Sequence, residues 1–573
     1  MDKKTIALVA ALVIVLLFYF QIMEFLGLYK PAPPQPAVQD TTAVDTTTQV
    51  VQQPPPAPSS VDTTTRAAVD TAAKVEAVVV EPAQVDTVIV TTDKYIITLS
   101  TFGGGPVSLR LREYDYRNDT LIEMLPDAGR VTPEATFAGG QFSTSNINFS
   151  CDLAPREYAV SREPLDIVYT YQNASGGEIK RHYRFYPDTY HYDLYLEVNG
   201  LDQLGFDRMY HLKWNTPLDP TEPQLDTDYE AMEAVAMQGG SRVTLDDFED
   251  GRLQQSMTGS ATWAGVRSKY FAAVMIPTNR VAESVSASGI KEKIATREGN
   301  IEMREITVGM ELPFSNINPS FADSFKVFVG PMSYSLLSSY DVGLEDMLGI
   351  GTTPYVGWII KPFAIAIIWL LPRMYSAIPN YGLVIILFAL AVKLITMPLS
   401  MKSFKSMNAM KELQPKMEEL KKKHKNNPQA LNQEMMKLYK THGVNPMSGC
   451  LPMLPQMPLF FALFSVFRST ILLRDAPFVW FIDDLSRGAS SFTDPYIVLV
   501  IIMIGAQYIS QKLTMASSQQ NKMFMYIMPL FMGFIFYRFA AGLVLYWACF
   551  SIFSLIDYFA FKRSNKNAQV KTA

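Results

Sequence analysis

The chain has 573 residues, of which 48% are hydrophobic, and carries a formal net charge of −5 at neutral pH. These averages could describe an ordinary large enzyme, but they combine two unlike parts of the chain. The three cysteines, Cys151, Cys450 and Cys549, lie far apart and predict no disulfide framework, which argues against redox chemistry.

Six apolar segments predict membrane spans, because a hydrocarbon core about 30 Å thick requires about 20 apolar helical residues. They comprise residues 6–28, 381–400, 446–467, 495–511, 523–537 and 539–556. The first predicts an N-terminal anchor over residues 1–29, and the others predict a five-helix core over residues 381–561. The membrane part is therefore expected to be all-α with six spans.

A cleaved signal peptide is the alternative to the anchor, because Lys3 and Lys4 precede an apolar core. The apolar stretch continues to Leu28, and no small-x-small cleavage motif precedes Pro31, so we expect a retained anchor. In residues 30–92, Pro, Thr, Val, Gln, Ala and Asp then dominate. Such a composition buries too little apolar surface to offset chain entropy, and it predicts a flexible tether.

Residues 93–345 have the alternating pattern of β-strands. In HYDLYLEV at 191–198, Tyr192 and every second residue after it predict one buried face, while the residues between them are more polar. Similar short runs occur at 95–99, 167–171 and 325–329, separated by turn-rich stretches such as FGGGP at 102–106. This part of the chain is predicted to be one large β-sandwich domain.

No catalytic chemistry is indicated in this domain or elsewhere. The five histidines, His182, His191, His211, His424 and His442, lack the spacing of metal ligands. The glycine-rich segments do not end in the Lys-Ser or Lys-Thr of a phosphate-binding loop. We therefore predict no enzyme, no metal site and no cofactor.

Residues 356–375 predict a helix that lies on the outer membrane surface. Lys361, Pro362, Pro372 and Arg373 interrupt the apolar run and leave pieces too short to cross a bilayer. Tryptophans within the segment are typical of membrane interfaces. The alternative is a kinked extension of the following span.

Lys393 is the one formal charge within residues 381–400. A lysine at the centre of a membrane helix costs about 2.5–3.5 kcal/mol on insertion scales, so we expect a functional reason for its presence. Snorkelling is the alternative, because Lys393 lies about 10 Å along the helix from Ser400 and a long side chain can recover much of that distance.

Residues 402–445 predict a helical hairpin. Two thin apolar stripes can pack together, and the segment around Pro428 provides the turn. The outward face is rich in lysine, including Lys411, Lys416, Lys421, Lys422 and Lys423. We interpret the hairpin either as a docking arm for anionic partners such as ribosomal RNA or lipid headgroups, or simply as a solvated basic loop.

The distribution of basic residues predicts the orientation. Lys3 and Lys4, the hairpin, the loop flanked by Lys512 and Lys522, and the basic tail 562–573 all fall on one side if the chain crosses six times. Both termini, the hairpin and the tail are therefore expected to be cytoplasmic, and the β-sandwich domain is expected on the opposite side.

Several motifs resemble those of YidC-type membrane protein insertases. NPMSGCLP at 445–452, followed by QMPLF at 456–460, is similar to the start of the third span in that family. Other similar motifs are LQPK at 413–416, QEMMKLY at 433–439, GLVLYW at 542–547, Trp263, KYF at 269–271 and GP at 330–331. The resemblance covers the chain apart from the tether.

The resemblance implies a bacterial inner-membrane insertase that inserts and helps fold nascent membrane proteins, alone or with the Sec translocon. It implies a multi-domain membrane protein with a periplasmic β-supersandwich, a cytoplasmic hairpin and five helices around a hydrophilic groove. The hairpin and basic tail would contact the ribosome or signal recognition machinery. Lys393 stands where that family commonly has a groove arginine, and this sequence departs from the pattern there.

The substrate path of the family, carried over residue by residue, gives an apolar slide for the incoming helix. It comprises Met457 and Pro458 in the third span, Pro529 and Ile535 in the fifth, and Tyr546 and Trp547 in the sixth. Methionine and aromatic residues adapt to varied client side chains. Plain helix packing or lipid contact is the alternative for each position.

A secondary transporter of an anionic solute is the alternative function, because an intramembrane cation could bind such a solute. Transporters usually have paired halves with corresponding broken helices. We find no such repeat, since one predicted span precedes the large domain and five follow it. A scaffold or sensor whose β-domain binds a ligand is a third possibility.

Overall fold

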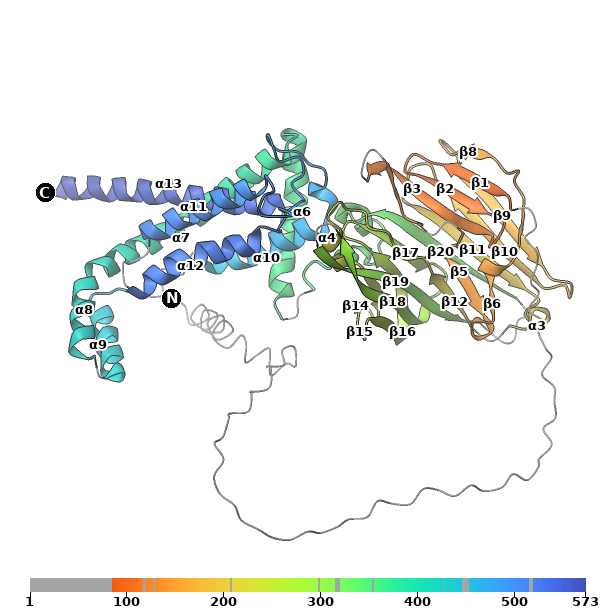
Figure 1. Ribbon diagram of the computed structural model, residues 1–573, viewed down its shortest axis with the longest axis horizontal. Helices are drawn as coiled ribbons and strands as arrows, with labels where there is room; N and C mark the ends of the chain where they lie inside the picture. Colours follow the sequence, from red (N-terminus) through yellow and green to blue (C-terminus); the bar gives the residue numbers. More distant parts are fainter. Residues whose placement is uncertain are drawn as a thin grey trace, which may run out of the picture. The chain divides into compact units, whose positions relative to one another are not determined.

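The computed structural model describes residues 85–572, with gaps at 117–119, 127–128, 207–208, 297–298, 315–319, 353–354, 426, 446–452 and 515–518. The predicted anchor and the tether up to residue 84 lie outside the described residues. The described chain is β-rich as far as Pro331 and helical from Gly357 onward (Figure 1).

Two sheets build the β-rich part. The smaller has five strands in the order β4-β3-β2-β1-β8, and the larger has fifteen, in the order β6-β5-β12-β19-β18-β16-β17-β20-β11-β10-β9-β7 with β13 to β15 joined beside β16. The strands are β1 (Thr87–Thr91), β2 (Tyr95–Ser100), β3 (Gly105–Asp115), β4 (Leu121–Glu123), β5 (Glu134–Phe137), β6 (Phe142–Ser143), β7 (Ser150–Cys151), β8 (Glu157–Ala159), β9 (Leu165–Gln172), β10 (Glu178–Phe185), β11 (His191–Asn199), β12 (Met209–Trp214), β13 (Glu233–Gln238), β14 (Ser241–Leu245), β15 (Phe248–Glu249), β16 (Arg252–Arg267), β17 (Phe271–Pro277), β18 (Ala282–Thr296), β19 (Gly299–Pro313) and β20 (Ser320–Pro331). Short helices between them are η2 (Ala138–Gly140), η3 (Thr144–Asn146), α3 (Leu201–Leu204) and α4 (Leu225–Ala231), and α5 (Tyr334–Ser338) and η4 (Leu344–Leu348) follow.

Alternation of apolar residues explains the strands. In β11 the alternate apolar residues from Tyr192 to Val198 are buried, as predicted. Asp193 is buried as well, and its carboxylate accepts a 2.6 Å hydrogen bond from the Tyr186 hydroxyl. The runs predicted at 95–99, 167–171 and 325–329 are confirmed within β2, β9 and β20.

The boundary predicted at residue 92 between tether and β-domain is wrong by one strand. β1 buries Val88 and Val90, and it pairs with β2 and in parallel with β8. The Val- and Thr-rich sequence of β1 differs little from the residues before it. Only pairing with neighbouring strands separates this segment from the tether.

Eight α-helices and one short 3₁₀ helix follow in the described part of the C-terminal region. They are α6 (Gly357–Ala377), α7 (Tyr381–Glu412), α8 (Gln414–Lys423), α9 (Pro428–Thr441), α10 (Met453–Ser469), η6 (Ile471–Leu473), α11 (Ile497–Thr514), α12 (Gln519–Phe536) and α13 (Ala541–Thr572). By length and composition, α6, α7 and residues Ala541–Ala560 of α13 are able to cross a membrane. The apolar helical segments Ile497–Leu513 and Tyr526–Phe536 are shorter.

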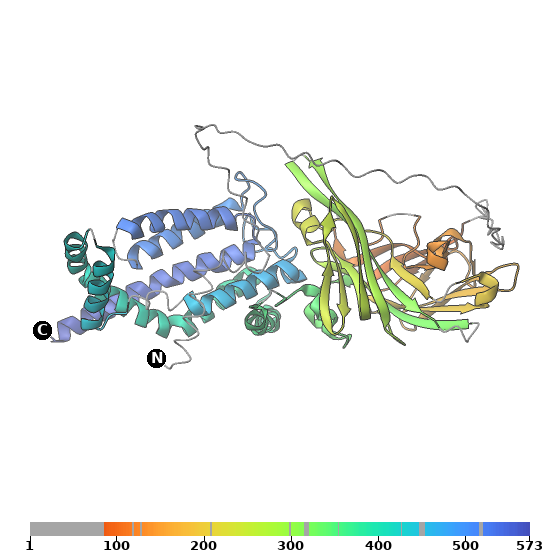
Figure 2. The ribbon, with the colours of Figure 1, turned by 90° about the horizontal axis from the view of Figure 1, so that it is seen from below.

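Helix α6 differs from its prediction in one respect. Pro362 and Pro372 lie inside a continuous helix of 21 residues, so the expectation that they cut the segment into pieces too short to span is wrong. The turn through Ile378 and Asn380 separates α6 from α7, and the Asn380 side chain caps α7 by accepting a hydrogen bond from the Leu383 amide. Figure 2 shows α6 end-on while the other long helices run lengthwise, so α6 crosses them at a steep angle and is not a simple extension of α7.

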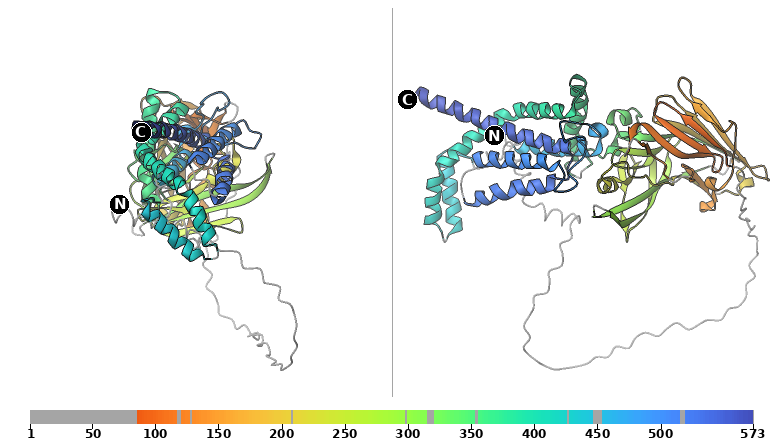
Figure 3. Two further views of the ribbon diagram at one scale, coloured as in Figure 1. Left: turned by 90° about the vertical axis from the view of Figure 1, so that its left-hand side faces the viewer. Right: turned by 45° about the horizontal axis from the view of Figure 1, so that its top comes forward.

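Helix α7 is longer than the predicted span. It continues past Ser400 to Glu412, and α8 and α9 then form a pair of helices (Figures 1 and 3). The Tyr439 hydroxyl lies 3.7 Å from the Met417 sulfur across this pair. The predicted hairpin region 402–445 therefore consists of the end of α7 followed by the two shorter helices.

The remaining helices pack in neighbouring pairs. Helices α7 and α11 both lie against α13, α12 lies against α11, and α10 lies against α6. Ile385 of α7, Met503 of α11 and Val544 of α13 are buried in this apolar core. The packing holds in place the polar residues described next.

Candidate functional site

Lys393 belongs to α7 and faces α13, and its side chain is only 5% exposed. The ammonium group donates a 2.9 Å hydrogen bond to the Ser554 hydroxyl and lies 3.1 Å from a carboxylate oxygen of Asp557. Its third neighbour is the ring of Phe550, with the nitrogen 4.8 Å from the centroid. In this arrangement the amine faces α13 inside the helical bundle.

One face of α13 carries the residues around this amine. Tyr546, Phe550, Ser554 and Asp557 recur at the three- and four-residue spacing that places side chains on one side of a helix. The rings of Tyr546 and Phe550 are 6.0 Å apart. The stripe therefore connects the predicted groove cation with Tyr546, one of the predicted slide residues.

Further polar side chains lie buried among the helices. The Gln456 amide of α10 donates a 3.1 Å hydrogen bond to the Tyr546 hydroxyl. The side-chain carbonyl oxygens of Gln456, Gln507 and Gln511 are buried and have no hydrogen-bond partner within the described residues. Buried polar atoms normally find partners, so these three indicate an interior suited to water or to polar groups of a ligand.

The predicted slide residues do not form one continuous surface. Tyr546 is fully buried, whereas Trp547 packs on Phe460 of α10 and Phe536 of α12, with ring centroids 5.3 and 5.7 Å away. Met457 and Pro458 on α10 are partly exposed, Pro529 on α12 is buried, and Ile535 on α12 is 37% exposed. Trp547 therefore links α10, α12 and α13, the three helices that carry the predicted slide residues.

Ile535 also lines a cavity of about 430 Å³ at one end of α10 and α12. Phe464, Phe534 and Leu543 supply its apolar wall, and Arg468 and Arg538 lie at its edge. This cavity is lined by residues of the β-domain as well, including Gln224. It therefore lies where the helical bundle meets that domain.

The five hairpin lysines occupy two different environments. Lys411 belongs to α7, and its amine donates a 2.8 Å hydrogen bond to the Leu513 carbonyl at the end of α11, as a helix C-cap does. Lys416 contacts His442 of α9 at 3.1 Å. Lys421, Lys422 and Lys423 are exposed in the last turn of α8. Lys416 and these last three are therefore exposed, whereas Lys411 is partly buried.

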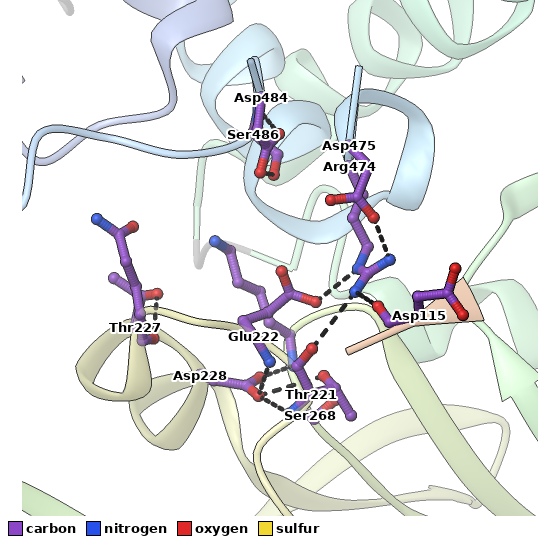
Figure 4. A network of polar contacts seen from close by, with 12 residues as sticks. Asp115, Thr221, Glu222, Thr227, Asp228, Ser268, Arg474, Asp475, Asp484 and Ser486 are labelled. Atoms are coloured by element: carbon purple, nitrogen blue, oxygen red, sulfur yellow. Dashed lines mark hydrogen bonds and ion pairs between the residues drawn. The ribbon is translucent and has the colours of Figure 1, made fainter. Parts of the chain in front are cut away.

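A second polar cluster joins the β-domain to the loop after α10. Arg474 donates from Nε to Glu222 at 2.7 Å, and both side chains are 4% exposed. The same guanidinium donates to the Asp115 carbonyl at 2.7 Å (Figure 4). Asp228 of α4, which is fully buried, fixes the neighbouring backbone by accepting from the amides of Glu222 and Lys269.

Burial raises the pKa of Glu222 to about 7, although the neighbouring Arg474 lowers it. Lys269 and Tyr270, from the KYF motif, are buried beside this cluster, and Phe271 lies 5.6 Å under the Arg474 guanidinium. The motif that carried the resemblance in the β-domain therefore lies at its junction with the helical part.

Asp557 was not predicted because the last predicted span ended at residue 556, and Ser554, inside that span, carries no charge that would distinguish it. An acidic residue inside the apolar stretch that continues to Phe561 was the available signal. Glu222 and Arg474 gave no such signal, because both lie among other charged residues and are 252 positions apart.

The fold and the buried polar residues define an integral membrane protein that combines an apolar helical bundle with a large β-sheet domain. Residues 373–569 match the family model of the 60Kd inner membrane protein, and residues 87–366 match that of the YidC periplasmic domain. The membrane protein insertase YidC of Chlorobaculum tepidum is 32% identical, covering 97% of this chain and 93% of the relative. That of Syntrophus aciditrophicus is 31% identical, covering 97% and 98%.

A crystal structure of an active YidC insertase is also similar, with 19% identity and a TM-score of 0.34 over 82% of this chain and 91% of that chain. The chain belongs to the YidC family of membrane protein insertases. It is a multi-pass inner-membrane protein with a β-rich periplasmic-type domain, and its function is the insertion of nascent membrane proteins. The relatives are named for this non-enzymatic function, which does not favour the secondary transporter.

Proposed function

We propose that α7 and α10 to α13 enclose a hydrophilic groove that holds the polar part of a nascent membrane protein while its apolar helix enters the lipid. The observation that carries this proposal is the set of buried polar groups, namely the unpartnered amide oxygens of Gln456, Gln507 and Gln511 and the Lys393–Asp557 pair. Such groups are costly in a dry membrane interior, and water in a groove would satisfy them.

Lys393 is the proposed groove cation. In a partly hydrated site of low dielectric, an ammonium group attracts an acidic or polar client segment more strongly than it would in bulk water. The translocated tail of the client could then be held part of the way across the membrane. This holding step requires no nucleotide hydrolysis.

The apolar helix of the client would leave along α10 and α12. Met457, Pro458, Pro529, Ile535 and Trp547 are the proposed contacts, with Tyr546 facing the polar interior. The exposure of Ile535 and the partial exposure of Met457 support direct contact with a client. Pro529, which is buried, would act by shaping α12.

The proposed orientation places both termini, the α8–α9 hairpin and the basic tail 562–573 in the cytoplasm, six spans in the membrane and the β-domain in the periplasm. Helix α6 would lie on the outer leaflet. The exposed lysines of α8 would dock anionic surfaces of the ribosome, the signal recognition machinery or lipid headgroups, and insertion would proceed alone or with the Sec translocon.

The test uses full-length protein in liposomes and a single-span client whose translocated tail carries aspartates. Insertion is measured as protection of the tail from external protease. We expect Lys393→Arg to retain insertion and Lys393→Ala to reduce it. Lys402→Ala is the matched control, because Lys402 is an exposed lysine on the same helix. Undiminished insertion by Lys393→Ala would refute the role of the cation.

A further inference from the structure

Asp557 is the charged partner of Lys393, and the pair is nearly closed to solvent. The amine and carboxylate are 3.1 Å apart, and their side chains are 5% and 11% exposed. Ser554, on the same face of α13, accepts a hydrogen bond of 2.9 Å from the same amine. One helix face thus offers a charged and a neutral ligand to a single ammonium group.

Packing alone gives no reason for this pair. Replacing a buried ion pair by apolar residues of similar size is often neutral or stabilising. Ionisable residues inside a membrane helix bundle are rare and typically mark a functional path.

The Asp557 carboxylate has fewer partners than the buried carboxylate of Asp494. Within the described residues, its ion pair with Lys393 is its one ion pair, and its Oδ2 atom accepts no hydrogen bond of good geometry. By contrast, Asp494 accepts from Arg487, from the amide and hydroxyl of Ser490 and from the Tyr496 amide. The Asp557 carboxylate is therefore held mainly by charge attraction to Lys393, and another anion could displace it from the amine.

We propose that Asp557 is the resident counter-ion of the groove, which holds the Lys393 ammonium in position until an acidic client segment displaces it. The inference rests on the proposed role of Lys393 as the groove cation. The exchange conserves charge, because one ion pair breaks as an equivalent one forms. Asp557 is then a positioning residue that sets how acidic a client segment must be to bind.

The test compares two versions of the single-span client, with aspartates or with asparagines at the same positions of the translocated tail. The readout is the ratio of protected acidic tail to protected neutral tail in liposomes that contain the full-length protein. Asp557→Asn removes the competing carboxylate, so we expect this ratio to rise about five-fold or more, because ion pairs shielded from water are stronger than exposed ones. Asp557→Glu should restore the wild-type ratio.

Asp166→Asn is the matched control, because it removes the carboxylate of an exposed ion pair in the β-domain, outside the proposed groove, and should leave the ratio unchanged. Asp557→Ser provides a second neutral variant if Asp557→Asn does not accumulate. A ratio that is unchanged or lowered in both neutral variants would mean that the pair is structural, and would overturn the inference. If Lys393→Gln retained the wild-type ratio, the proposed function of Lys393 would itself fail, which is a separate outcome.

Discussion

Two buried ion pairs dominate the chemistry at the residue scale. Lys393 pairs with Asp557 inside the bundle, and Arg474 pairs with Glu222 at the junction with the β-domain. Removing one partner of a buried pair leaves an uncompensated charge and typically costs about 3–5 kcal/mol. A single substitution in either pair can therefore change both stability and activity, and the two should be measured together.

Glu222 predicts a pH dependence of stability. Burial raises its pKa from 4.5 to about 7, so between these values the folded protein holds a proton that the unfolded chain has released. The stabilisation is therefore complete below pH 4.5 and is lost as the pH rises toward 7, by up to about 3 kcal/mol. We expect the unfolding temperature in detergent to fall over this range, and Glu222→Gln to flatten the slope.

Asp166 provides a control of opposite sign. The Arg184 guanidinium beside it lowers the pKa of this exposed carboxyl, so its contribution is present at higher pH and is lost on acidification. Asp166→Asn should therefore leave the loss of stability with rising pH in place. An unchanged slope in Glu222→Gln would contradict the assignment.

At the scale of elements, α12 presents neighbouring residues in opposite environments. Ile535 is 37% exposed and lines the cavity near α10, whereas Phe536 is 1% exposed and packs on Trp547. A probe at Ile535 should therefore report contact with a client, and a probe at the adjacent Phe536 should report contact within the bundle.

A photocrosslinker tests this difference directly. Placed at Ile535 or at Met457, it should capture a ribosome-stalled nascent chain, because these side chains are accessible from outside the bundle. Placed at Phe536, it should react within the bundle instead. Equal capture from Ile535 and Phe536 would argue against a defined client path along α12.

Helix α6 is long enough to span a membrane but crosses the other helices steeply, and its orientation can be measured. Trp358 and Trp369 are both exposed and lie about 16 Å apart along the helix at 1.5 Å per residue. In a variant that keeps only these tryptophans, lipids brominated at different depths should quench both equally if α6 lies on the surface. Clearly different depths would mean that α6 crosses the bilayer.

At the scale of the whole molecule, the β-domain and the helical part share a polar junction. It contains the buried Arg474–Glu222 pair and the exposed Arg538–Asp226 pair, whose side chains are 56% and 32% exposed. Gln224 adds a 3.0 Å hydrogen bond to the Gly488 carbonyl. These contacts make the loop after α10 and the segment after α12 structural partners of the domain.

The two arginines predict different effects at this junction. Arg474→Met should destabilise it most strongly above pH 7, where Glu222 is ionised and remains buried without its partner. Arg538→Met should cost at most about 1 kcal/mol, because the lost pair is exposed to solvent. Hydrogen exchange of the segment around Glu222 in the full-length protein measures both, and equal protection in the two variants would contradict the assignment.

Much of the architecture was predictable because it depends on local patterns. Period-two alternation predicted β11, and apolar runs predicted the starts of α7 and α13 within a few residues. The YidC-type motifs predicted the family, which the comparisons confirm. Boundaries were less accurate, as at β1 and at the end of α7, because strand pairing and helix packing continue an element past the point where its composition changes.

The sequence by itself determined that this is a membrane protein of a known insertase family, with a lysine placed inside an apolar helix. Only the tertiary structure decided that Asp557 neutralises this lysine and that Arg474 meets Glu222. The physical reason is that periodicity and hydropathy are properties of neighbouring residues, whereas an ion pair depends on which helix faces and loops pack together. Residues separated by more than a hundred positions meet only when the chain has folded.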